Sequence, residues 1–79
     1  MKLINTDNGV LVTIISIDGG FEFEDRLRQI GLVPGYVLEI IRKAPFKGPF
    51  LVRVNGRNIA LGQRAATNIN VEEIKCDLR

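Results

Sequence analysis

A chain of 79 residues is long enough for one small domain and too short for two, and its apolar fraction of 46% is typical of a folded protein rather than a disordered one. Its net charge of +2 is too mild to indicate a partner by itself. The sequence has no histidine and only one cysteine, Cys76, so it lacks the commonest general base, the commonest metal ligand and any internal disulfide. We therefore expect a single domain over residues 1–79 without catalytic residues, cofactor or metal site.

The cysteine count and the N-terminus indicate the compartment. A secreted domain of this size would usually need disulfides, so a single cysteine favours the reducing cytoplasm. The N-terminal residues lack the long apolar run of a signal peptide, and no segment approaches the length of a membrane span. We expect an intact cytoplasmic protein that does not insert directly into a membrane.

The first two predicted elements are a strand and a helix. Residues 10–17 (VLVTIISI) are apolar and rich in β-branched side chains, which predicts a strand buried on much of both faces. Residues 21–32 (FEFEDRLRQIGL) have acids early and arginines later, as the helix dipole favours. Apolar residues recur on one face of this helix, at Phe23, Leu27 and Ile30. Gly31 suits the left-handed residue that ends a helix.

The rest of the chain reads as strands separated by turn residues. Val33 to Tyr36 (VPGY) predicts a type II turn, and Asn55-Gly56 a two-residue hairpin turn. We expect strands over residues 37–43, 50–54, 57–61 and 69–74, a proline-containing loop over 44–49, and a short, partly helical connection over 62–68. This order predicts a mainly β fold, a small SH3-like, five-stranded, partly open barrel with one short helix inserted after the first strand.

Basic side chains concentrate in one stretch. Residues 40–71 contain no acid and six cations, namely Arg42, Lys43, Lys47, Arg53, Arg57 and Arg64. A positive surface made by them would suit nucleic acid, anionic lipid or an acidic protein, or would be an ordinary solvated exterior. Nucleic acid is disfavoured, because few aromatic rings are available to stack on bases, Phe50 is expected to face the core, and no nucleic-acid-binding motif is present.

Two short segments offer more specific hypotheses. In the loop APFKGP, Phe46 and Lys47 are expected at the tip, where an apolar ring beside a cation suits a protein contact; alternatively, Phe46 folds back over the barrel. Four acids fall within eight residues, at Asp18, Glu22, Glu24 and Asp25. They could collect a hard cation. Their spacing matches no known cation loop, however, so stabilisation of a helix start explains them better.

The turn residues, in order and spacing, resemble those of the FeoA family of small SH3-like proteins of bacterial ferrous iron uptake. The resemblance covers the last two-thirds of the chain and rests on Leu27, Gly31-Leu32, Pro34-Gly35, Leu38, Ile40, Ala44-Pro45, Pro49, Ile59-Ala60-Leu61, Ile69 and Val71. Two positions depart from the family pattern. Lys47-Gly48 replaces Gly-Asp before the second proline, and Ala65-Ala66 lies where members often carry an acid.

The resemblance implies a regulatory accessory protein and no enzyme. Its partner would be a FeoB-like membrane iron transporter, bound at the transporter's cytoplasmic GTP-binding domain. The candidate contact residues are Arg26 on the helix, Arg42 and Lys43 before the loop, and Phe46 and Lys47 at its tip. Open strand edges would also allow a homo-oligomer.

Two other functions remain as alternatives. The SH3-like domain of metal-dependent transcriptional repressors has a similar sequence pattern, but it normally follows DNA-binding and dimerisation domains that this chain does not contain. A small RNA-binding barrel would use Arg53, Arg57 and Arg64 and would bind in a salt-sensitive way. We rank both below the accessory protein.

Overall fold

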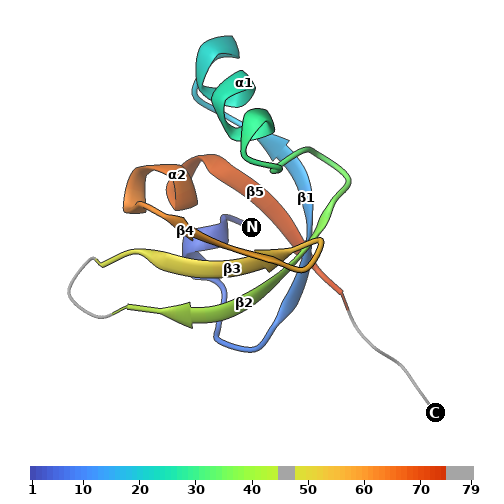
Figure 1. Ribbon diagram of the computed structural model, residues 1–79, viewed down its shortest axis with the longest axis vertical. Helices are drawn as coiled ribbons and strands as arrows, with labels where there is room; N and C mark the ends of the chain where they lie inside the picture. Colours follow the sequence, from blue (N-terminus) through green and yellow to red (C-terminus); the bar gives the residue numbers. More distant parts are fainter. Residues whose placement is uncertain (45–47, 75–79) are drawn as a thin grey trace.

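The computed structural model describes residues 1–44 and 48–74. Five strands form one antiparallel sheet in the order β4-β3-β2-β1-β5, and Figure 1 shows how it curls around a single core. The predicted fold class, a mainly β, SH3-like fold, is confirmed. In chain order the elements are the 3-10 helix η1 (Leu3–Asn5), β1 (Leu11–Ile17), α1 (Phe21–Gln29), β2 (Val37–Lys43), β3 (Phe50–Val54), β4 (Arg57–Leu61), α2 (Gln63–Asn68) and β5 (Ile69–Glu73).

β1 lies in the sheet between β2 and β5 and buries only one of its faces. Val12 and Ile14 point into the core, whereas Leu11 and Ile15 are exposed. The expectation of a strand buried on both faces is therefore wrong, because no helix or second sheet covers the outer face of β1 in the described structure. The pairing with β5 shifts between Ile14 and Ser16, so Ile15 is a bulge residue that bends the strand.

α1 ends as its sequence predicts. Gly31 has a φ of 102° and its N–H donates to the Arg28 carbonyl, while the Leu32 N–H donates to the Leu27 carbonyl at 2.9 Å. This pair of bonds is a Schellman motif, and its usual apolar contact is supplied by the buried Leu27 and Leu32. The predicted apolar face is only partly right: Leu27 is buried and Phe23 is half-buried, but Ile30 is exposed because it lies at the helix cap.

The predicted turns and strands of the meander are confirmed. The Tyr36 N–H donates to the Val33 carbonyl, and β2, β3 and β4 have the predicted bounds. Asn55 and Gly56 both have positive φ, 53° and 78°, as a type I′ hairpin turn requires. Phe50 lies in the core, as expected.

The N-terminal residues close the core, which the sequence did not predict. Leu3 in η1 is fully buried, and the hydroxyl of buried Thr6 donates to its carbonyl at 2.7 Å. Met1 exchanges backbone hydrogen bonds with Val71 of β5. η1 packs against α2, whose Ala66 is also buried.

Neither α-helix in the described part of the chain has the length and apolarity needed to cross a membrane.

We predict that Gly31→Ala destabilises the protein by about 1 kcal/mol, because a side chain is strained at positive φ; in a domain of this size this lowers Tm by about 4–8 °C. Gly31→Asn is the matched control, because asparagine tolerates the left-handed conformation better than alanine does, and an added Cβ at Gly31 meets no atom within 4 Å. Thermal unfolding followed by circular dichroism should show a larger loss for Gly31→Ala than for Gly31→Asn. An equal Tm for both variants would contradict the role of the Schellman cap.

Candidate interaction surface

The predicted contact residues do not form one continuous site. Arg42 and Lys43 end β2, where Arg42 is exposed and the Lys43 ammonium lies 5.5 Å from the centroid of the Phe50 ring. Arg26 lies on α1, which projects at the top of Figure 1, well away from the end of β2 and the start of β3 at the left. Phe46 and Lys47 lie outside the described residues.

A shallow hollow lies on the outer surface of the β2-β3-β4 sheet. The register places Arg42 opposite Leu51 and Leu51 opposite Ala60, so these three side chains form a row across the strands. Ala44 and Pro49 complete the lining of a hollow of about 300 Å³. Four of its five lining residues are apolar, and Arg42 supplies the one charge. We call this the sheet hollow.

A second hollow of about 250 Å³ lies between the start of α1 and α2. It is lined by Gly19, Glu22, Phe23, Arg26, Arg64 and Asn68. Arg26 and Arg64, a cation from the acid-free stretch, both line this hollow, together with the acid Glu22. Neither arginine forms an ion pair within the part of the chain that the structure describes. Sequence reasoning missed this combination, since it depends on where two helices far apart in the chain lie in the folded protein. We call this the helix hollow.

The acid-free stretch does not produce a uniformly positive surface. The Arg53 guanidinium lies 3.6 Å from the Glu39 carboxylate and donates to the Asn58 side-chain oxygen at 3.1 Å. Arg53 is therefore partly neutralised by a cross-strand neighbour on β2. Arg42 and Arg64 belong to two different hollows, so the positive charge is divided between separate places.

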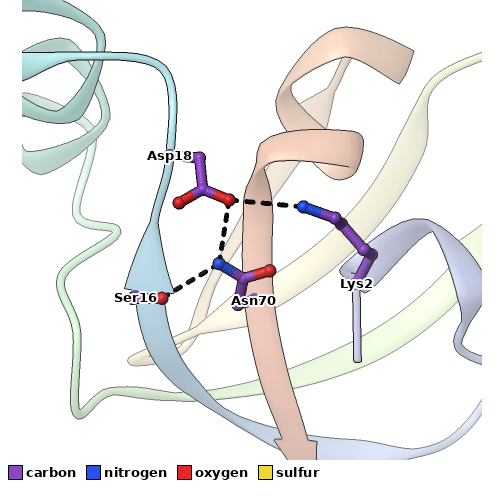
Figure 2. Close-up of polar contacts among 4 residues, drawn as sticks. All are labelled: Lys2, Ser16, Asp18 and Asn70. Carbon is purple, nitrogen blue, oxygen red and sulfur yellow. Dashed lines mark hydrogen bonds and ion pairs between the residues drawn. The ribbon is translucent and has the colours of Figure 1, made fainter.

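A polar cluster joins the N-terminus to the end of β1 (Figure 2). The Lys2 ammonium lies 3.2 Å from an Asp18 carboxylate oxygen, and the Asn70 amide donates to the same oxygen at 3.1 Å and to the Ser16 hydroxyl at 2.9 Å. The Asn70 amide, and after it Lys2, hold the pKa of the Asp18 carboxyl below its ordinary value. This carboxylate therefore helps to fasten the N-terminus to β5.

The acids considered for a cation have local partners instead. Asp18 belongs to the polar cluster, and Asp25 lies 3.9 Å from Arg28 and accepts a hydrogen bond from Gln29. Glu22 and Glu24 lie in the first turn of α1, as predicted from the helix dipole. Within residues 1–44 and 48–74, no three carboxylate, imidazole or thiol groups gather as a metal site would require.

The chain is similar to proteins of one family over nearly its whole length. The model of the FeoA domain family matches residues 1–73. The Fe(2+) transport protein A/Fe(2+) transporter FeoB fusion protein of Porphyromonas gingivalis (strain ATCC BAA-308 / W83) is 28% identical over 74 residues, which are 94% of this chain and 9% of that protein. The solution structure of iron(II) transport protein A from Clostridium thermocellum is 35% identical, with a TM-score of 0.86, and the match covers 94% of this chain and 46% of that one.

A wider likeness concerns the fold alone. The manganese-activated repressor ScaR in its apo form is 23% identical, with a TM-score of 0.85, over 94% of this chain and 35% of the repressor. The chain thus spans less than half the length of each of these three relatives.

We predict that ionised Asp18 stabilises the fold in a pH-dependent way. A carboxyl whose pKa is lowered by folding stabilises the protein above its unfolded-state pKa, and this stabilisation is lost as pH falls through the lower, folded-state pKa. Asp18→Asn should therefore lower Tm at neutral pH, and the difference from wild type should shrink on acidification. Asn70→Ala should weaken the same trend. A Tm difference that stays constant from neutral to acid pH would contradict this role.

Proposed function

Since this chain belongs to the FeoA family, we propose that it is a non-enzymatic accessory protein of ferrous iron transport. It acts in the cytoplasm by binding the GTP-binding region of a FeoB-like transporter. The observation that carries this proposal is the Porphyromonas gingivalis relative, in which transport protein A and the FeoB transporter are fused. Fusion holds two domains at high effective concentration, so even a weak contact between them is populated. We expect the domain described here to make the same contact through its own surface.

The residue types and their arrangement favour binding of another protein over catalysis. The sequence contains no histidine, and the hydroxyl of its only serine, Ser16, accepts a hydrogen bond from Asn70. No base is placed to activate it within the described residues. Both hollows are shallow and carry cations, which suits the acidic surface of another protein.

The proposed contact has two parts. The main part is the connected end of the β2–β3 hairpin, with Arg42 and Lys43 at the end of β2, together with Phe46 and Lys47, which lie outside the described residues. Arg26 on α1 is the second part, and it is separated from the first (Figure 1). A partner that touches both must be large enough to span the molecule, as a GTP-binding domain is. The likeness to ScaR concerns the fold alone and lends no support to a repressor function.

We predict that amide NMR signals of the ¹⁵N-labelled protein shift when the cytoplasmic GTP-binding domain of FeoB from the same genome is added. The shifts should cluster on residues 42–48 and on α1. Arg42→Glu combined with Lys43→Glu should weaken binding about tenfold, because charge reversal at a complementary contact costs more than 1 kcal/mol. Phe46→Ala combined with Lys47→Glu, and Arg26→Glu alone, should also weaken it.

Arg28→Glu is the matched control for charge. Arg28 lies on the same helix as Arg26, but its guanidinium is next to Asp25 and it lines neither hollow. This variant should bind within about twofold of wild type, as expected for a surface charge away from the contact. The absence of any shift at high concentration, both with and without a GTP analogue, would remove the proposed partner.

A further inference from the structure

β4 is the open edge of the sheet. The strand order places β4 at one end and β5 at the other. β5 is partly covered, because Met1 bonds to Val71 and Lys2 forms a bridge with Asn70. Within the described residues no element pairs with β4 on the side away from β3. An uncovered edge is a template for another strand.

The register shows which backbone groups of β4 point outward. The two-residue turn makes Val54 and Arg57 the first pair that exchanges hydrogen bonds, and such pairs alternate along an antiparallel ladder. Val52 with Ile59 and Phe50 with Leu61 are therefore bonded pairs too. Between them, Asn58 and Ala60 direct their N–H and C=O groups away from β3. Two donors and two acceptors are thus available at the edge.

The sheet hollow lies beside these groups. Ala60 is exposed, and its side chain is the last in the row Arg42, Leu51, Ala60 on the outer surface. In an added strand about 4.8 Å away, the residue opposite Ala60 points its side chain to the same surface. That side chain would lie beside Ala60, at the rim of the hollow. The methyl group of Ala60 is too small to block it.

The charge around the edge selects the occupant. Residues 40–71 contain no acid, and the exposed Arg57 begins β4, on the face of that strand opposite to Ala60. An acidic segment is attracted to this edge. A second copy of the chain is disfavoured, because pairing β4 with its own copy brings two acid-free stretches together.

We propose that the β4 edge and the sheet hollow bind an extended segment of a partner protein in which apolar and acidic residues alternate. The segment adds to the sheet as a sixth strand through the backbone of Asn58 and Ala60. One apolar side chain lies at the rim of the hollow beside Ala60, and the acidic side chains, which point to the other face of the added strand, lie on the face of Arg57. The inference rests on the proposed function only in that the partner is expected to carry such a segment. Strand addition would give affinity through the backbone and specificity through the hollow.

The test uses the full chain and a blocked synthetic peptide of alternating valine and glutamate, about eight residues long, the length of an ordinary strand. We expect amide shifts on β4 and the sheet hollow. A peptide of alternating valine and lysine should bind at least about tenfold more weakly. Ala60→Pro should weaken binding to a similar extent, because it removes an outward N–H without touching the β3 ladder. Ala60→Ser keeps this N–H and should bind within about twofold of wild type.

A second measurement tests the same backbone contact with the wild-type protein, so the result does not depend on whether Ala60→Pro folds. A peptide N-methylated at every valine loses the donors that face Asn58 and Ala60, because the residue opposite Ala60 is the apolar one, and with the wild-type protein it should bind at least about tenfold more weakly. No shifts with the acidic peptide, equal binding of the lysine peptide, unchanged binding of Ala60→Pro, or dimerisation of the protein through β4 would each overturn the inference. If the GTP-binding domain binds but the peptide does not, only the inference fails. If the peptide binds but the GTP-binding domain does not, only the proposed function fails.

Discussion

The structure depends on the interior place of β1, between β2 and β5 in the sheet. This strand pairs with β2 on one side and with β5, from the end of the described chain, on the other. Register shifts in β1 and β2 bend both strands, so the sheet curls around one core instead of lying flat. Without the β1–β5 ladder, α2 and the N-terminal turn would have no surface to pack on. The long-range pairing of β1 with β5 therefore holds α2 and the N-terminal turn, which the meander of β2, β3 and β4 does not.

The N-terminus shows how such a small core is completed. Fully burying Leu3 removes an apolar side chain from water, worth about 2 kcal/mol. The backbone bonds between Met1 and Val71 and the polar cluster around Asp18 keep Leu3 in place. An acid that could belong to a cation site thus stabilises the fold.

The cationic side chains lie at separate places on the surface and do not form one continuous patch. Arg53 is partly neutralised by Glu39, Arg42 faces the sheet hollow, and Arg26 and Arg64 line the helix hollow. A molecule with separate cationic contacts suits a folded protein partner better than a polyanion, which favours one continuous positive track. The open β4 edge adds a backbone contact beside the sheet hollow, so side-chain charge and main-chain hydrogen bonds can act together.

The sequence by itself determined the local structure of this protein. Gly31 ends α1, Asn55-Gly56 reverses the chain, and the apolar runs form the strands, because these preferences act between residues close in the chain. Tertiary structure decided the rest. It left Leu11 and Ile15 exposed, placed Leu3 in the core, and brought Arg26 and Arg64 to one hollow. The register that aligns Arg42, Leu51 and Ala60 also depends on the bulge in β2 and the β3–β4 turn acting together. Residue types show which side chains can bind, but only the packing of distant segments decides which of them share a surface.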